Sequence, residues 1–392
     1  MPGDLIYLDN AATTYPKPRP VLDRMIDIYG RQGVSPGRGS YDLAVEAEEL
    51  AGAARSKLAR FFKCPDPDRV IFAGNATDAL NLVIQGLIRP GDHVVSTRLE
   101  HNSVLRPLYH LRQQGRIDYD LASFDGQGFI DPAEIGRLIR ADTRMVIVNH
   151  ASNVLGTVQP VAEIGRVCAD RGVPLIIDAA QSAGVIPIDM SAWQVGAVAF
   201  TGHKSLFGPS GIGGLAVSPE LEIQITRFGG TGIDSHSLTH TPTFPHRLEA
   251  GTLNLLGVIG LSLGLDFLEA EGIEVIHRRE MELLARLRDG LAGLPGIRLY
   301  GVEDLSRHVG LMMVNVEGID PEDVGAILDA DFDIAVRVGL HCAPLVHESL
   351  GTAPRGGVRF SLGPFNRVEE IDRTIAAMRL IAESGKRSGK PR

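Results

Sequence analysis

The chain has 392 residues, of which 44% are hydrophobic and 22% are charged, and its formal net charge at pH 7 is −9. This composition is that of an ordinary globular protein and excludes the disordered and fibrous classes. The negative charge disfavours a nucleic-acid-binding protein, and no apolar run is long enough to span a membrane. Three cysteines, none in a Cys-x-x-Cys pair, exclude a disulfide framework and a thiolate zinc site. We therefore expect a soluble cytoplasmic protein that binds neither nucleic acid nor membrane.

The first two thirds of the chain alternate short apolar runs with helical patterns. Such alternation predicts an α/β fold with a mostly parallel sheet that is covered by helices on both faces. Helices are expected at 77–87 and 161–171, among others. The expected strands are 69–73, 93–96, 145–149, 175–177, 197–201 and 214–217.

The pattern changes after about residue 251. One long helical stretch is predicted over 257–294, where Pro295 and Gly296 end it. It is followed by strands at 297–300 and 311–316, a helix at 321–330 and a strand at 334–337. This part of the chain predicts a smaller α+β domain.

Two polar residues at strand ends indicate a cofactor. Asp178 ends one predicted buried strand, and Lys204 lies on the loop after another. A lysine amine can form a Schiff base with pyridoxal phosphate, and a carboxylate can keep the pyridine nitrogen of that cofactor protonated. The spacing alone is only suggestive, so the surrounding residues decide the matter.

A phosphate site is predicted where a strand, a glycine turn and a helix start follow one another over 71–81. The amides and dipole of a helix N-terminus favour an anion, and the Thr77 hydroxyl adds a donor. Thr77 or Asn75 could instead simply cap the helix. With Lys204 and Asp178 in the same chain, the phosphate interpretation is the better one. The glycine-rich run 207–214 lacks the strand-to-helix order of a dinucleotide fingerprint, and we interpret it as a turn into the next strand.

With these residues the chain resembles the class V aminotransferase-fold proteins of the cysteine desulfurase and selenocysteine lyase group. It is more similar to the group II branch of that group than to the group I branch. The resemblance implies a fold-type I pyridoxal-phosphate-dependent transferase with a mostly parallel seven-stranded sheet. It also implies a homodimer whose subunit has an N-terminal segment packing on the small domain (1–15), a large cofactor-binding domain (16–255) and a small C-terminal domain (256–392). The segments that carry it are 7–14, 73–81, 100–103, 150–157, 178–181, 201–204, 249–252, 337–344 and 358–361.

The resemblance also implies roles for single residues. Lys204 is the Schiff-base lysine and general base, Asp178 pairs with the pyridine nitrogen, and His101 stacks on the ring and handles protons. Gln181 is expected to bond the phenolate oxygen of the ring. Arg359 is expected to bind the substrate carboxylate, which its guanidinium fork matches. The remaining implied residues are Ala76, Thr77, Thr201, His203 and Thr252 of the partner subunit at the cofactor, and Asn153, Ala12 and Arg38 at the cofactor or substrate.

Cys342 decides between chemistries. Desulfuration of L-cysteine needs a thiolate that attacks the substrate sulfur and becomes a persulfide, whereas transamination needs none. A cysteine of unknown setting is usually a buried apolar residue, as expected for Cys168 on its helical stripe, and Cys64 is assigned no role. For Cys342 the resemblance favours catalysis. His341 either activates Cys342 or packs, and both interpretations stay open.

Three histidines, at 236, 240 and 246, have no carboxylate or cysteine at ligand spacing, so we expect a solvated loop and no metal site. The chain departs from the family at Asn102, at Phe365 and in the long segment 344–357. These departures leave open the substrate, either L-cysteine or L-selenocysteine, and the sulfur-acceptor protein. The alternatives are a selenocysteine lyase or another carbon–sulfur lyase of this fold, or a non-catalytic sulfur-relay or regulatory protein that holds the cofactor.

Overall fold

The structure is a computed structural model that describes residues 5–37, 39–232 and 236–388. Its larger part is built on a seven-stranded sheet with the strand order β2-β8-β7-β6-β5-β3-β4. The strands β4, β3, β5, β6 and β7 run parallel to one another, whereas β8 runs antiparallel to both β7 and β2. The bounds are β2 Val70–Ala73, β3 Asp92–Thr97, β4 Ile117–Ala122, β5 Thr143–Asn149, β6 Leu175–Asp178, β7 Val195–Thr201 and β8 Gly213–Val217.

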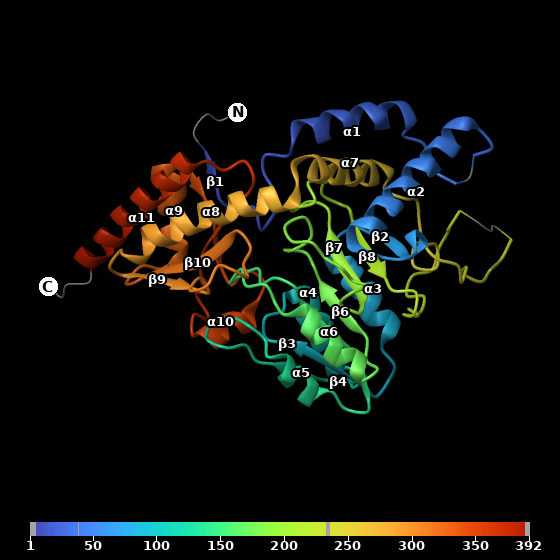
Figure 1. Ribbon diagram of the computed structural model, residues 1–392, viewed down its shortest axis with the longest axis horizontal. Helices are drawn as coiled ribbons and strands as arrows, with labels where there is room; N and C mark the ends of the chain where they lie inside the picture. Colours follow the sequence, from blue (N-terminus) through green and yellow to red (C-terminus); the bar gives the residue numbers. More distant parts are fainter. Residues whose placement is uncertain (1–4, 38, 233–235, 389–392) are drawn as a thin grey trace.

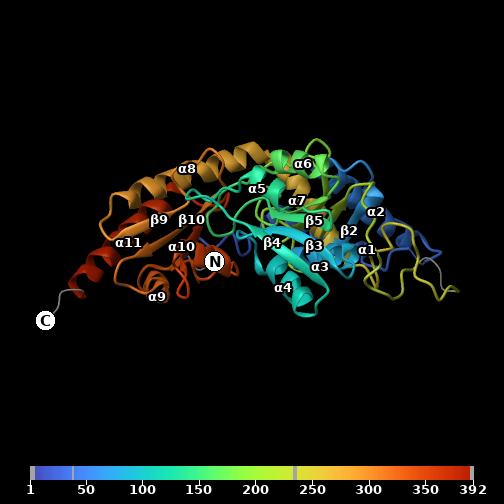
Figure 2. The ribbon, with the colours of Figure 1, turned by 90° about the horizontal axis from the view of Figure 1, so that it is seen from below.

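Helices cover both faces of this sheet, because its central strands are apolar on both sides and must be shielded from water. The helices α3 and α4 pack on one face, and α2, α5, α6 and α7 cover the other, as Figure 2 shows for most of them. The α/β class and the mostly parallel seven-stranded sheet are therefore confirmed. The bounds are α1 Arg19–Gln32, α2 Asp42–Phe62, η1 Pro67–Arg69, α3 Ala76–Leu87, α4 Asn102–Gln113, α5 Pro132–Leu138, α6 Val161–Asp170 and α7 Leu255–Glu271.

The smaller part of the molecule is an antiparallel sheet with the order β12-β13-β10-β9, packed against helices α8, α9 and α11 (Figure 1). A two-stranded parallel sheet of β1 and β11 adds the start of the chain to this part. The division of the chain into domains at residues 15 and 255 stays a prediction. The bounds are β1 Ile6–Tyr7, α8 Ile273–Ala292, β9 Ile297–Tyr300, β10 Leu311–Val316, α9 Pro321–Phe332, β11 Ile334–Ala335, β12 Arg337–Gly339, α10 Pro344–Leu350, β13 Gly357–Ser361 and α11 Val368–Ser388.

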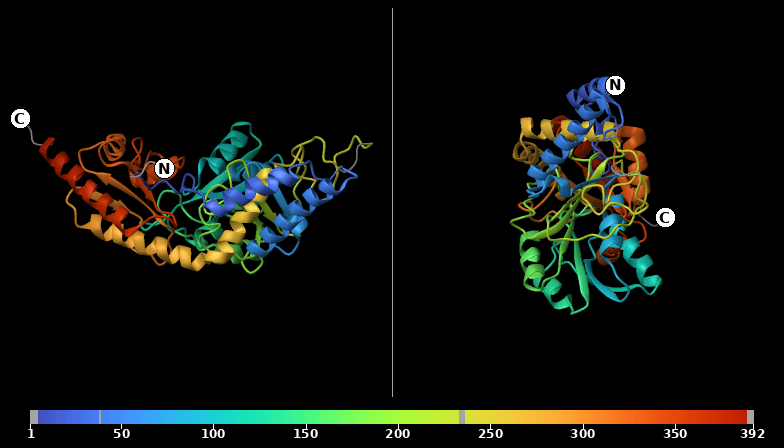
Figure 3. Two further views of the ribbon diagram at one scale, coloured as in Figure 1. Left: turned by 90° about the horizontal axis from the view of Figure 1, so that it is seen from above. Right: turned by 90° about the vertical axis from the view of Figure 1, so that its right-hand side faces the viewer.

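Two predicted elements are wrong in detail. The single helical stretch 257–294 is two helices, α7 and α8, which bend apart in Figure 3, because Gly272 has a φ of +82° that a right-handed helix cannot contain. The single strand 334–337 is also split. Ile334 and Ala335 pair with β1, whereas Arg337 begins β12 and pairs with β13.

Among the described residues, no helix is long and apolar enough to cross a membrane.

The packing of α6 on the sheet depends on Gly165. A methyl group at this position would overlap the backbone oxygen of Trp193. We expect Gly165→Ala to destabilise the fold by about 1–3 kcal/mol, because backbone at the contact must shift. The measurement is the thermal unfolding midpoint, with Gly52→Ala as the control. Gly52 lies in helix α2 with no atom within 4 Å of an added Cβ, so the control should be unchanged or slightly more stable. Equal midpoints for both variants would contradict the prediction.

Candidate active site

A cavity of about 470 Å³ lies at the carboxyl ends of the parallel strands and is closed on one side by the smaller sheet. It brings together predicted residues that lie far apart in the sequence, and two further predicted residues, Cys342 and Thr252, do not line it. Arg38 lies outside the described residues. The predicted residues that line the cavity are Ala12, Ala76, Thr77, His101, Asn153, Asp178, Gln181, Thr201, His203, Lys204 and Arg359.

The register of the parallel strands places the cavity. Asn149 at the end of β5 pairs with Asp178 at the end of β6, and Asp178 pairs with Ala199 in β7. Since parallel strands end on the same edge of a sheet, the loops that follow them converge there. Lys204 lies on the loop after β7, and its amine therefore comes near the Asp178 carboxylate.

Burial changes the ionisation of this pair. The pKa of Lys204 is lowered to about 8, mainly because burial disfavours the ammonium form, while the charge of Asp178 opposes the shift. Burial raises the pKa of Asp178, while an N–H···O bond of 2.9 Å from Ala180 and the charge of Lys204 act in the opposite direction. A lysine with a pKa near 8 has a substantial neutral fraction at physiological pH, which a nucleophile or general base requires.

His101 precedes the first residue of α4 and is held in one tautomer. The amide of Ser103 donates to His101 Nδ1 over 3.0 Å, so the proton of the neutral ring is on Nε2. Burial, followed by the charge of Lys204, lowers the pKa of His101 to about 4. His101 is therefore neutral at physiological pH.

The β2–α3 turn offers an anion site. The side chain of Asn75 accepts from the amide of Asp78, so Asn75 caps the helix, as the alternative interpretation held. The amides of Ala76 and Thr77 lie in the first turn and have no partner within the helix. Thr201 Oγ1 is buried and has no hydrogen-bond partner in the part of the chain that the structure describes. These unpaired donors fit a phosphate.

The loop that carries Lys204 is fixed by the N-terminal segment. The carbonyl of His203 accepts from Thr13 Oγ1 at 3.0 Å and from the Thr14 amide at 3.2 Å, and Lys17 also donates to it. Gln181 donates to the Ala11 carbonyl at 3.0 Å. The amine, the carboxylate and the anion site thus fit pyridoxal phosphate.

Arg359 comes from β13 and is 1% exposed. Its Nη2 donates to Asp9 Oδ1 at 2.7 Å and its Nη1 to the Asn153 carbonyl at 3.0 Å, whereas its Nε has no partner within the described ranges. Asn153 donates its amide to the His341 carbonyl at 2.6 Å, and its Oδ1 is buried without a partner in those ranges. These bonds therefore leave N–H donors of the guanidinium unused, and Arg359 lines the cavity.

Cys342 lies between β12 and α10 and is partly exposed. Arg337, which lines the cavity, directs its Nη2 at the Cys342 sulfur over 3.4 Å. The backbone there is unusual, because His341 and Cys342 have φ angles of 51° and 58°. The Asn102 amide donates to the Cys342 carbonyl at 2.7 Å and helps to hold this turn.

Sequence reasoning missed two of these residues. Arg337 stands in the same matched segment as Cys342, which was the available signal, but its contact with the sulfur depends on the turn between them. Asp9 lies 350 positions from Arg359, and nothing local in the sequence indicates that contact.

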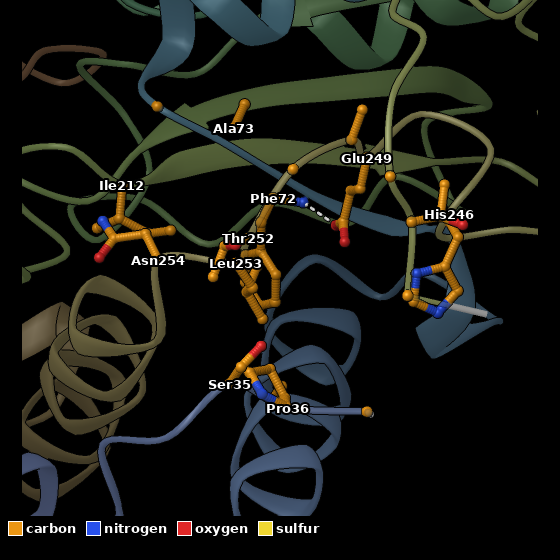
Figure 4. A pocket seen from close by; sticks show the side chains of 18 of the residues that line it. Ser35, Pro36, Phe72, Ala73, Ile212, His246, Glu249, Thr252, Leu253 and Asn254 are labelled. Atoms are coloured by element: carbon orange, nitrogen blue, oxygen red, sulfur yellow. Dashed lines mark hydrogen bonds between the residues drawn. The ribbon is translucent and has the colours of Figure 1, made fainter. Parts of the chain in front are cut away.

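Thr252 lines a different cavity, of about 840 Å³, on the other side of the β2–α3 turn (Figure 4). Glu249 in the same segment accepts from the Phe72 amide at 2.6 Å and forms an ion pair of 2.7 Å with Arg55. These bonds fix the segment that presents Thr252. The described residues contain no group of three or more His, Cys, Asp or Glu side chains that could hold a metal ion.

The chain is similar to known proteins over nearly its whole length. A family model described as aminotransferase class-V matches residues 6–374. A probable cysteine desulfurase of Methanothermobacter thermautotrophicus is 37% identical over 388 residues, which cover 97% of this chain and 96% of that protein. The apo structure of a cysteine desulfurase from Thermococcus onnurineus has a TM-score of 0.91 and 34% identity, and the match covers 97% of this chain and 95% of that chain. The crystal structure of the cysteine desulfurase CsdA from Escherichia coli has a TM-score of 0.87 and 28% identity. That match covers 97% of this chain and 95% of the CsdA chain.

These findings confirm the predicted resemblance to class V aminotransferases and cysteine desulfurases. The group II assignment and the roles of single residues stay predictions.

The lowered pKa of Lys204 predicts how the apo-protein reacts with an aldehyde. Only the neutral amine attacks, and its fraction falls about tenfold per pH unit below the pKa. We expect the rate of Schiff-base formation with pyridoxal phosphate to rise up to about pH 8 and then level off. Stopped-flow absorbance over a pH series measures this rate, and Lys204→Ala gives the background. A rate that still rises steeply well above pH 8 would show an ordinary lysine.

Proposed function

Because the chain belongs to the aminotransferase class-V family, we propose that it is a pyridoxal-phosphate-dependent cysteine desulfurase. It converts L-cysteine to L-alanine and transfers the sulfur to Cys342 as a persulfide. Relatives and solved structures named cysteine desulfurase, at 37% and 34% identity over nearly the whole chain, support this. The observation that carries the proposal is the Arg337–Cys342 contact at the edge of the cavity that holds Lys204.

The cofactor is held by the residues that fit it. Lys204 would provide the amine for the Schiff base, and Asp178 would provide the carboxylate for the pyridine nitrogen. Thr77, Thr201 and the first amides of α3 bind the phosphate. Pyridoxal phosphate, when bound, supplies an electron-withdrawing ring that stabilises negative charge at the substrate Cα.

Lys204 moves protons at the substrate. Its Nζ removes the Cα proton and can deliver a proton to Cβ after sulfur has left, because both atoms lie within reach of one flexible amine. The lowered pKa of Lys204 suits both directions of transfer near neutral pH. Neutral His101 lines the cavity, where its Nε2–H could donate a hydrogen bond to the reacting groups and its ring would stack on the bound cofactor.

Arg359 and Asn153 orient the substrate. The N–H groups of Arg359 that its bonds to Asp9 and Asn153 leave unused are the donors available to the substrate carboxylate, and the charge of the guanidinium strengthens that bond. Asp9 fixes the guanidinium from the opposite side. With its carboxylate held by Arg359, a bound cysteine could direct its Cβ–sulfur bond toward Cys342.

Cys342 takes the sulfur as a nucleophile. Its thiolate attacks the substrate sulfur, an S–S bond forms, and the Cβ–S bond breaks with its electron pair going to the carbon side. The balance is L-cysteine plus the Cys342 thiol giving L-alanine plus the Cys342 persulfide, with no external oxidant or reductant. Arg337 stabilises the charge on the attacking sulfur. An acceptor thiol, on a sulfur-acceptor protein or a small molecule, then removes the outer sulfur. Because Cys342 must stay reduced, we place the enzyme in the cytoplasm.

The test of this proposal is single-turnover alanine formation from L-cysteine with cofactor-loaded protein. We expect Cys342→Ala to lose at least about 100-fold in rate, because the nucleophile is gone, and mass spectrometry to find a persulfide on Cys342 of the wild type. Cys168→Ser is the control, since Cys168 is fully buried in helix α6.

Two results would contradict the proposal. Equal alanine formation by the wild type and Cys342→Ala would remove Cys342 from the chemistry and favour a selenocysteine lyase or another carbon–sulfur lyase. The absence of alanine from both would favour a non-catalytic protein.

We further propose that the enzyme is a homodimer in which Thr252 completes the phosphate site of the partner subunit. Thr252 is exposed and lines the cavity behind the β2–α3 turn and not the site of its own chain. Gly74 of that turn faces the same cavity. A Thr252 hydroxyl brought in by a second copy would therefore approach the turn from the open side.

Mixing two inactive variants tests the dimer. Lys204→Ala lacks the amine but keeps Thr252, and Thr252→Ala has weakened cofactor binding but keeps the amine. In a mixed dimer, one site has both groups, so we expect activity to return after subunit exchange at limiting cofactor. Two copies of Lys204→Ala provide the control. A mixture that stays at the sum of the separate activities would contradict a shared site.

A further inference from the structure

A buried chain of three polar side chains lies directly behind Cys342. His341 is 3% exposed, His347 is 0% exposed and Thr352 is 9% exposed. The two imidazole rings are nearly parallel, at 26°, with centroids 5.4 Å apart. His341 precedes the cysteine, His347 lies in α10 and Thr352 follows that helix. The proposed chemistry uses none of these three side chains.

The hydrogen bonds of this chain can run in only one direction. His341 Nε2 lies 3.3 Å from the Arg337 carbonyl, which can only accept, so Nε2 carries the proton. His341 Nδ1 must then accept from His347 Nε2 at 3.3 Å. His347 Nδ1 in turn accepts from the Thr352 hydroxyl at 2.8 Å, which is closer than the alternative acceptor, the His347 carbonyl at 3.4 Å.

This order requires both rings to be neutral. A second proton on His341 Nδ1 would set two N–H groups against each other at the His341–His347 contact, and a second proton on His347 Nδ1 would remove the acceptor of the Thr352 hydroxyl. Burial lowers the pKa of both histidines, that of His347 to about 4. The nearby guanidinium groups of Arg337 and Arg359 lower the pKa of His341 further. The hydrogen-bonded series His341–His347–Thr352 therefore persists at physiological pH.

The hydrogen-bonded series ends at Arg337, the residue that contacts the Cys342 sulfur. The carbonyl that His341 bonds belongs to Arg337, whose guanidinium donates to Cys342 Sγ at 3.4 Å. His341 and Cys342 both have positive φ angles, a conformation that is strained for residues other than glycine and persists only where neighbours hold it. The His341 ring bonds the Arg337 carbonyl through Nε2 and His347 through Nδ1, so the His347 ring fixes its orientation.

Resting on the proposed desulfuration, we propose that His347 and Thr352 are positioning residues for sulfur transfer. They fix the His341 ring, which braces the strained turn and holds Arg337 against the Cys342 sulfur. Neither side chain touches the substrate or the reacting sulfur. His347 and Thr352 thus raise the reactivity of Cys342 and leave the binding of the cofactor and of the amino acid unchanged.

Paired substitutions in the full-length, cofactor-loaded protein test this role. His347→Phe and Thr352→Val remove the hydrogen bonds with little change of shape, whereas His347→Gln and Thr352→Ser keep a donor. The first readout is the rate of Cys342 alkylation by iodoacetamide, followed by peptide mass spectrometry. The second is kcat and KM for alanine formation from L-cysteine. Glu348→Gln, on the exposed side of α10, is the control.

We expect His347→Phe and Thr352→Val to lower the alkylation rate and kcat by about tenfold or more, because a small displacement of a reacting group costs that much. KM should change little, and the Gln and Ser variants should recover most of the rate. Wild-type rates of alkylation and alanine formation in His347→Phe and Thr352→Val would overturn the proposal. Equal losses of rate in all four variants would overturn it as well. Thr352→Val keeps the test decisive if His347→Phe does not fold.

The two proposals fail differently. A wild type that forms no alanine would refute the desulfurase, while the alkylation rates would still report the positioning of Cys342. Normal alanine formation with unchanged alkylation in every variant would refute only the positioning role.

Discussion

The site depends on the parallel register of β5, β6 and β7. That register sets Asn149 beside Asp178 and Asp178 beside β7, so the loops after these strands meet at one edge of the sheet. The strands are buried on both faces, and a shift by one residue would turn each side chain to the opposite face. The electrostatics follow from this position, because the same burial that supports the sheet lowers the pKa of Lys204 and raises that of Asp178.

The N-terminal segment joins the two sheets at the site. On one side Asp9 forms a buried ion pair with Arg359 of β13, and on the other Thr13 donates to the His203 carbonyl beside Lys204. Breaking a buried ion pair by removing one partner costs about 3–5 kcal/mol, since the remaining charge is left uncompensated. The segment therefore connects the Arg359 guanidinium to the loop that carries Lys204, although Arg359 and this loop belong to different sheets.

The sequence predicts what is local and misses what depends on turns. The α/β class, the seven-stranded sheet and most of the cavity residues follow from apolar periodicity and from matched segments. The break at Gly272 was missed because the apolar pattern of α7 and α8 continues across it, and a glycine within a helical pattern does not by itself reveal its φ. The His341–His347 chain could not be predicted either. It needs α10 to begin two residues after Cys342, whereas the sequence indicates only that the segment 344–357 is long.

The setting of Cys342 decides how sulfur can leave. Its carbonyl accepts from the Asn102 amide, and the preceding carbonyl accepts from Asn153, while α10 starts two residues later. Each of these hydrogen bonds contributes about 1 kcal/mol to stability. Together they hold the strained turn that carries Cys342 in place. Cys342 is nevertheless partly exposed. In the proposed reaction a persulfide would extend one atom beyond the Cys342 sulfur, so an acceptor thiol would have to reach Cys342 at the edge of the cavity to remove the outer sulfur.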